Sequence, residues 1–315
     1  MELKRETIVE ELCDIWKGII DELRISEEEI RKKLGISSKY SVCKVLEKMG
    51  EYWRIEERNN YGNEFNRKKW VRTATVKMIL DSFGIDYDNE VLKLSIVLGA
   101  IVNSADDISD LKLDESSREK KIEYLIREVL SGVLYSKLLI EFSSKYYDKT
   151  NKLLMKVEKY FIELSYIPLM ERKYYEEIQN ILNESEMINK ACEAYLMRAV
   201  DIDIFSKLFL LTNNDLTGKK KRRIEETLRY VRALEILAKD RYDLHYDLNE
   251  QDVYTPLVAL YNRFGPESID KYVMKIYKMK IYKGISERVE RRFFNDDNAL
   301  KIIKQYSSDL FNYFR

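Results

Sequence analysis

Residues that break regular structure are scarce in this 315-residue chain, which has only 10 glycines and 3 prolines. Because glycine and proline dominate tight turns, their scarcity excludes a fold of many short strands and leaves room for long helices. Hydrophobic residues make up 45% of the chain and charged residues 35%, which is typical of a globular protein with a sizeable core. We therefore expect an all-α fold.

An excess of charge of either sign is also lacking, since Lys plus Arg and Asp plus Glu both count 55. This balance disfavours a strong attraction to nucleic acids or acidic lipids. The three cysteines form no CxxC pair, which favours free thiols in a reducing compartment. The sequence shows neither an apolar signal segment nor an uncharged run long enough to span a bilayer. We expect a cytoplasmic protein without a membrane span and without nucleic acid as a partner.

Helical periodicity dominates what is present. Leu154, Val157, Phe161 and Leu164, for example, recur at three- and four-residue steps. The pattern predicts helices over 119–148, 150–166, 170–182, 185–212 and about 220–247. A helix stop is expected at Gly84, and the clearest mid-chain break lies at 213–218. Because there is no repeat and no low-complexity linker, we expect one domain over 1–315, with divergent N-terminal helices in 1–60.

A group of aspartates follows the apolar run 91–102. On a helix Asp106 and Asp110 lie one turn apart, and Asp107 lies three residues from Asp110. Like charges so close repel each other unless they share a cation. Oxygen ligands with no nearby His or Cys favour a hard ion such as Mg²⁺, whose usual second partner is a substrate phosphate. We predict a magnesium site here.

A second acidic group follows the apolar residues 234–238. Asp240, Asp243 and Asp247 share one helical stripe because their spacings are three and four residues. Two such helices facing each other across a cavity would hold Mg²⁺ ions and a diphosphate, and the ions would neutralise a departing pyrophosphate. The alternative is that each acidic group is a solvated helix face. His245, the only histidine, is expected to be exposed or hydrogen-bonded rather than a metal ligand.

Several short motifs occur in an informative order, and with them the chain resembles the trans-isoprenyl diphosphate synthases. Asp106, Asp107 and Asp110 match the first DDxxD motif of that family. Lys69 and Arg72 match the Lys and the last Arg of its GGKRxRP motif. The segment 255–260, with the sequence TPLVAL, is similar to the family's TLPLIxAL segment. The resemblance covers roughly residues 60–315.

The resemblance implies a single large helical bundle of the isoprenoid synthase type with a central cavity and with Mg²⁺ as the cofactor. It also implies ionisation of an allylic prenyl diphosphate and its condensation with isopentenyl diphosphate, in a homodimer or in a heteromer with another prenyl synthase subunit. The implied catalytic and metal-binding residues are Asp106, Asp107 and Asp110, with Asp240, Asp243 and Asp247 as further metal ligands. The implied substrate-binding residues are Lys69, Arg72, Arg118 and Arg198. Ile101 and Val102 stand where bulky side chains shorten the product in that family, so their aliphatic side chains imply a cavity deep enough for a long product chain.

Departures from the family pattern leave alternatives open. Arg241 stands where the second motif has an Asp, and Trp70 replaces an Arg of the basic motif. Asp201 and Asp203 lie in the region of a Lys-Thr pair that the family uses. Because these lost cations bind diphosphate in the family, a class I terpene cyclase with Arg198 as diphosphate sensor is one alternative, and a catalytically degenerate subunit is another. A helix-turn-helix-like pattern over 26–46 gives a DNA-binding alternative, which the charge balance disfavours.

Overall fold

The structure is a computed structural model that describes residues 11–12, 14–15, 18–19, 71–109, 132, 135–250, 253–278, 283–284, 301 and 305–306. For 104–109 it describes the helix but not the side chains. Regular structure in these residues is helical, with no strand among them, so the all-α prediction is confirmed for this part of the chain. None of the described helices is long and apolar enough to cross a membrane.

The chain divides into two compact units, Met1–Met78 with Tyr87–Lys152, and Ile79–Asp86 with Leu153–Arg315. Each unit is described by itself below. The prediction of one domain over 1–315 stays a prediction.

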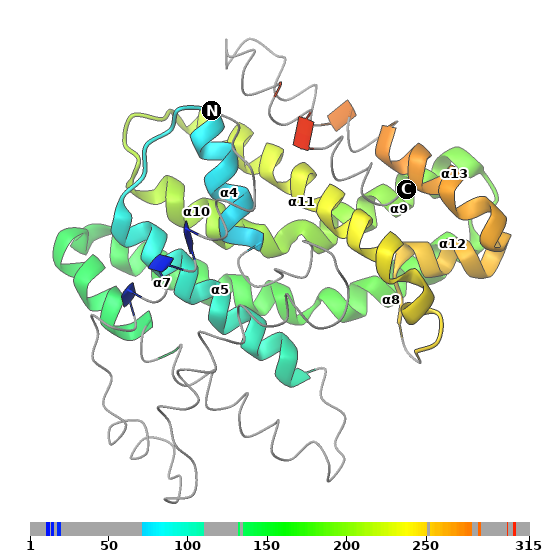
Figure 1. Ribbon diagram of the computed structural model, residues 1–315, viewed down its shortest axis with the longest axis horizontal. Helices are drawn as coiled ribbons and strands as arrows, with labels where there is room; N and C mark the ends of the chain where they lie inside the picture. Colours follow the sequence, from blue (N-terminus) through cyan, green and yellow to red (C-terminus); the bar gives the residue numbers. More distant parts are fainter. Residues whose placement is uncertain are drawn as a thin grey trace, which may run out of the picture. The chain divides into compact units, whose positions relative to one another are not determined.

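The first unit is built around α5 (Asn89–Ser109), which α4 (Val71–Ser82) accompanies in the chain (Figure 1). Most of α5 is buried, which confirms the apolar helix expected before the aspartates. The hydroxyls of Thr73 on α4 and Ser95 on α5 lie 2.9 Å apart in the core and share a hydrogen bond. Beyond α4, Gly84 has a φ of 61°, which confirms the predicted helix stop because glycine tolerates this left-handed conformation.

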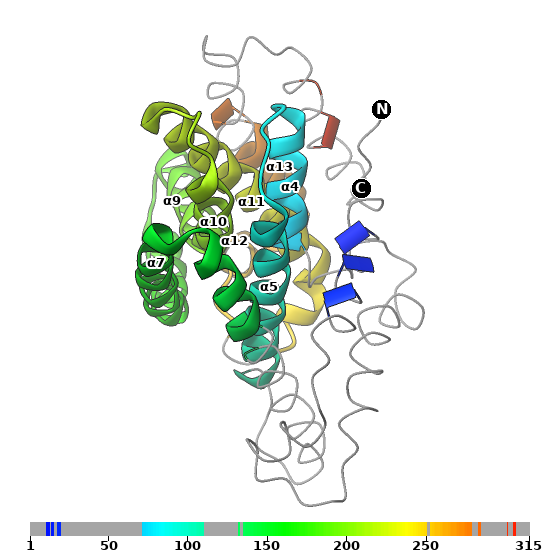
Figure 2. The same ribbon diagram turned by 90° about the vertical axis from the view of Figure 1, so that its left-hand side faces the viewer.

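The second unit contains most of the described helices. In chain order they are α7 (Tyr147–Ser165, whose first residues belong to the first unit), α8 (Ile167–Asn180), α9 (Glu184–Arg198), η4 (Ala199–Ile202), α10 (Asp203–Thr212), α11 (Gly218–Asp247), α12 (Pro256–Phe264), η5 (Pro266–Ser268) and α13 (Ile269–Ile276). The long helix α11 packs against α9, η4 and α10, which lie together on one side of it (Figure 2). α8 packs against α9 and α12.

Local sequence signals account for the ends of these helices. Thr217 and Thr255 cap α11 and α12 by accepting hydrogen bonds from the backbone N–H three residues later. Pro256 follows as the first residue of α12, where its missing N–H costs nothing. α12 ends at Gly265, whose φ of 77° is open to glycine but strained for other residues. The helix expected over about 220–247 is therefore confirmed.

The single helix expected over 185–212 is wrong, because η4 interrupts it. At this turn the Tyr160 hydroxyl donates a hydrogen bond of 2.9 Å to the Asp201 carbonyl, so that a side chain from α7 satisfies this backbone group. The tighter 3₁₀ geometry also changes the direction of the side chains that follow. Periodicity alone does not reveal such a break, since apolar residues continue through it.

Candidate functional site

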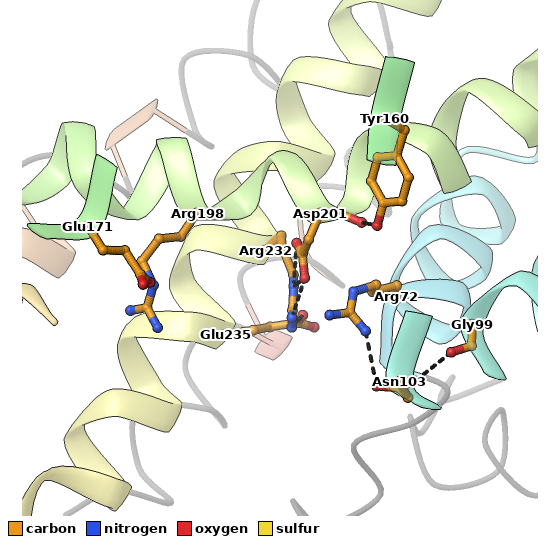
Figure 3. A network of polar contacts seen from close by, with 9 residues as sticks. All are labelled: Arg72, Gly99, Asn103, Tyr160, Glu171, Arg198, Asp201, Arg232 and Glu235. Atoms are coloured by element: carbon orange, nitrogen blue, oxygen red, sulfur yellow. Dashed lines mark hydrogen bonds and ion pairs between the residues drawn. The ribbon is translucent and has the colours of Figure 1, made fainter. Parts of the chain in front are cut away.

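The end of α5 that carries the first aspartates is contacted by a residue of the basic motif. Arg72, on the first turn of α4, donates a hydrogen bond of 3.3 Å from Nη1 to Oδ1 of Asn103 on α5 (Figure 3). Asn103 is itself held by its amide, which donates a 2.7 Å bond to the Gly99 carbonyl. Positions 106 and 107 follow Asn103 by three and four residues, so they lie on the same helix face as Asn103. Arg72 therefore contacts, within the first unit, a residue of α5 that lies 31 residues later in the chain and on the helix face of positions 106 and 107.

Several predicted residues lie beyond what the structure describes. The side chains of Asp106 and Asp107 belong to the part of α5 described as helix only, and Lys69, Asp110 and Arg118 lie outside the described residues. Their roles stay predictions. Ile101 is half-buried and Val102 is buried. Their proposed effect on cavity depth also stays a prediction.

Acidic and arginine side chains are paired between α11 and the helices packed against it. Arg198 at the end of α9 pairs with Asp240, Asp201 in η4 pairs with Arg232, and Asp203 in α10 pairs with Arg229. As the residue number rises from 198 to 203, its partner on α11 falls from 240 to 229. The pairs are therefore the rungs between two antiparallel helical segments.

Arg198 lies between carboxylates from two helices. Its Nε is 2.7 Å from Oε1 of Glu171 on α8, and its Nη1 donates to Oδ2 of Asp240 on α11. The Asp240 side chain is only 3% exposed and that of Arg198 15%. Burial lowers the pKa of Arg198, but Asp240 and Glu171 outweigh burial and raise it, so the guanidinium stays charged. Glu171 is different, because burial raises its pKa against the opposing effect of Arg198.

The next rung is a buried triad. Arg232 donates to both carboxylate oxygens of Asp201, at 2.7 Å from Nη2 and 3.0 Å from Nε, and its Nη1 lies 3.1 Å from Oε2 of Glu235 (Figure 3). The Tyr306 hydroxyl donates to Oε1 of Glu235. A fork of guanidinium donors on a carboxylate is a strong and geometrically specific contact. Asp201 is therefore bonded across to α11 through Arg232.

The second acidic group does not have the geometry of a metal centre. Asp240 is bonded to Arg198, while Asp243 lies 3.7 Å from the Lys239 ammonium. Burial, followed by the charges of Asp240 and Asp243, raises the pKa of Asp247 to about 6. Nowhere in the described part of the chain do three or more His, Cys, Asp or Glu residues group closely enough to hold a metal ion. The magnesium site predicted at this stripe stays a prediction.

A buried tyrosine completes the surroundings of Arg198. Tyr195 lies one turn earlier on α9, and its ring centroid is 5.9 Å from the Arg198 guanidinium carbon. Its hydroxyl makes no hydrogen bond of full geometry with the described residues. Even so, Asp240 is close enough to add to the effect of burial, and both raise the pKa of Tyr195. One polar group in this buried region is therefore unsatisfied.

Sequence reasoning identified Arg198 and Asp240 but missed their neighbours Glu171, Arg232 and Glu235. The spacing of Arg229, Arg232 and Glu235 on α11 did carry a signal, because steps of three residues place them along one helix face. Which helix that face meets was not readable from the spacing.

His245 is exposed, as expected, and its ring centroid lies 3.6 Å from that of Tyr246. The basic run 219–223 forms the first turns of α11. Within it, Lys221 donates to the carbonyls of Leu210 and Asn213 and so satisfies the end of α10.

Comparison with known proteins gives one structural likeness. No family model matches the chain, and no curated protein sequence matches it. Among solved structures, the chain is similar to geranylgeranyl pyrophosphate synthetase from the archaeon Geoglobus acetivorans, with 11% sequence identity and a TM-score of 0.47. The likeness covers 98% of this chain and 99% of that one.

Proposed function

We propose that the protein is a Mg²⁺-dependent prenyltransferase that extends an allylic prenyl diphosphate with isopentenyl diphosphate. The observation that carries the proposal is the hydrogen bond from Arg72 to Asn103. It brings the arginine of the basic motif to the face of α5 on which the first aspartates stand. A cation next to a carboxylate group that binds metal is the arrangement that a diphosphate substrate requires.

In this proposal Asp106, Asp107 and Asp110 would hold Mg²⁺, which supplies charge neutralisation to the leaving diphosphate. Lys69 and Arg72 hold and orient the isopentenyl diphosphate. The C–O bond of the allylic substrate breaks with its electron pair going to the diphosphate. The double bond of isopentenyl diphosphate then attacks the allylic carbon, and the resulting cation loses a proton to form the new double bond.

A catalytically degenerate subunit of a heteromeric synthase is the second candidate. It is favoured by the pairing of Asp201, Asp203 and Asp240 with arginines, because carboxylates used in this way stabilise a fold rather than a substrate complex. Such a subunit would keep the helical scaffold and lose turnover.

Association with a second copy of the chain is part of the proposal. It is supported by exposed apolar side chains on α7 and α8, among them Met155 at 69% exposure and Leu169 at 67%. Large apolar side chains in such numbers on neighbouring helices mark interaction surfaces.

The test is product analysis with Mg²⁺ and geranyl, farnesyl or geranylgeranyl diphosphate, each with and without labelled isopentenyl diphosphate. We expect longer diphosphates only with the label. Arg72→Gln should raise the KM for isopentenyl diphosphate roughly ten- to hundredfold, the loss expected for one hydrogen bond to a charged group. The matched control is Arg222→Gln, which removes an arginine from an exposed pair with Glu226.

The outcomes separate the candidates. Hydrocarbon or alcohol formed without the label would identify a cyclase instead. Folded protein that gives no product in any reaction would refute the prenyltransferase and favour the degenerate subunit.

A further inference from the structure

We propose that Arg198 is a built-in cation that takes the place of a metal ion at the acidic stripe of α11, formed by Asp240, Asp243 and Asp247. The inference builds on the proposed function, because it says which of the two predicted acidic groups binds metal. The stripe of α11 binds none.

The first support is the position of the Arg198 guanidinium. It reaches from the C-terminal end of α9 and bonds Asp240, the buried carboxylate with which the stripe begins. On its other side it bonds Glu171 at 2.7 Å. The contacts come from three different helices, α8, α9 and α11, so packing fixes the charge in place.

The second support is electrostatic exclusion. A divalent ion bound to Asp240 would lie next to a guanidinium already bonded to that carboxylate, and two cations so close repel each other. Because Arg198 is held by packing and by Glu171, it does not move aside without breaking a buried pair. Without Asp240, only Asp243 and Asp247 are left as metal ligands, one fewer than the three carboxylates of the stripe.

The third support is that Arg198 has hydrogen-bond donors beyond those bonded to Glu171 and Asp240. A guanidinium has five N–H donors in a planar fork. Arg198 uses Nε toward Glu171 and Nη1 toward Asp240, and Nη2 makes no hydrogen bond with the described residues. The Tyr195 hydroxyl nearby is buried and likewise without a hydrogen bond there. Arg198 therefore retains donors for an oxygen of a diphosphate, which is what a cation in this place has to supply.

The experiment counts Mn²⁺ ions by electron paramagnetic resonance, with methylenediphosphonate as a non-hydrolysable diphosphate, so that no turnover is needed. We expect Asp243→Asn/Asp247→Asn to bind as many ions as the wild type and with the same affinity. Arg198→Gln should gain one ion relative to the wild type, because the change removes the cation that is bonded to Asp240. Arg198→Gln/Asp240→Asn should lose this gain.

A matched control separates the effect from a general loss of positive charge. Arg229→Gln removes an arginine from the neighbouring rung with Asp203, on the same helix. It should not gain an ion, because Lys207, 3.6 Å from Asp203, still provides a positive charge there. Circular dichroism spectra establish that each variant is folded.

The inference is overturned if Asp243→Asn/Asp247→Asn loses an ion that the wild type binds, or if folded Arg198→Gln gains none. Where Arg198→Gln does not fold, the Asp243/Asp247 variant decides alone. A wild-type chain that binds no Mn²⁺ agrees with the inference but contradicts the metal proposed at Asp106 and Asp107. If the variant Asp106→Asn/Asp107→Asn binds as many Mn²⁺ ions as the wild type, only the proposed function is contradicted.

Discussion

Replacement of Arg232 by glutamine tests the buried triad of the second unit. The Arg232 side chain is 14% exposed, and those of Asp201 and Glu235 are 8% and 3% exposed. Burial lowers the pKa of Arg232, but Asp201 and Glu235 more than offset this and raise it, so the guanidinium stays charged. Arg232→Gln removes the positive charge that lies between these two buried carboxylates.

The magnitude follows from that arrangement. Removing one partner of a buried ion pair costs about 3–5 kcal/mol, because the other partner stays desolvated without compensation. Arg232→Gln should therefore lower the free energy of unfolding by about 3–5 kcal/mol, since the neutral amide removes the positive charge that bridges two buried carboxylates. The matched control is Arg222→Gln on the same helix. The side chains of Arg222 and of its ion-pair partner Glu226 are 81% and 39% exposed. An exposed pair of this kind contributes only about 0.3–0.5 kcal/mol.

The assay is urea unfolding of both variants and the wild type, followed by circular dichroism of the helices. Arg232→Gln should unfold at clearly lower urea than Arg222→Gln. A difference between the two variants of less than about 1 kcal/mol would refute the reasoning, because the triad would then behave as an exposed pair.

Two further predictions concern Asp247 and Gly265. Burial and then the charges of Asp240 and Asp243 raise the pKa of Asp247 from 3.8 to about 6, so the folded state binds this proton more tightly than the unfolded state and loses stability as the pH rises between these values. Asp247→Asn should therefore have a higher Tm than the wild type at pH 8 and an equal Tm below pH 3.8. Equal Tm values at every pH would contradict the raised pKa of Asp247. Gly265→Ala should cost about 1–3 kcal/mol through backbone strain, because φ is 77° and an added Cβ meets no atom within 4 Å. The control Gly218→Ala has the same open space without the positive φ, and an equal loss of Tm in both variants would show that strain is not the cause.

Much of the helical framework was predictable because its signals are local. Helix ends follow from Thr217, Thr255 and Gly84, which act through hydrogen bonds and backbone angles within a few residues. The buried α5 followed in the same way from its apolar run. η4 was missed, because the interruption coincides with a contact from Tyr160, 41 residues away from Asp201.

The candidate site shows the same division. Arg198 and Asp240 were recognised as chemically notable residues, but a metal ligand and a salt-bridge partner have identical sequence signals. The sequence did not show that Asp240 lies beside a guanidinium 42 residues earlier in the chain. Arg72 differs, since its motif assignment and its contact with Asn103 point to the same end of α5.

By itself, the sequence determined that the described chain is helical, where most of its helices begin and end, and which residues carry charge at apolar helix ends. These properties depend on backbone geometry and on neighbours within one or two turns. Only the tertiary structure decided that Arg198, Asp201 and Asp203 meet α11 as rungs of buried ion pairs. The reason is that such pairs depend on the antiparallel packing of segments 26 to 42 residues apart, and the free energy of a charge depends on what that packing places beside it.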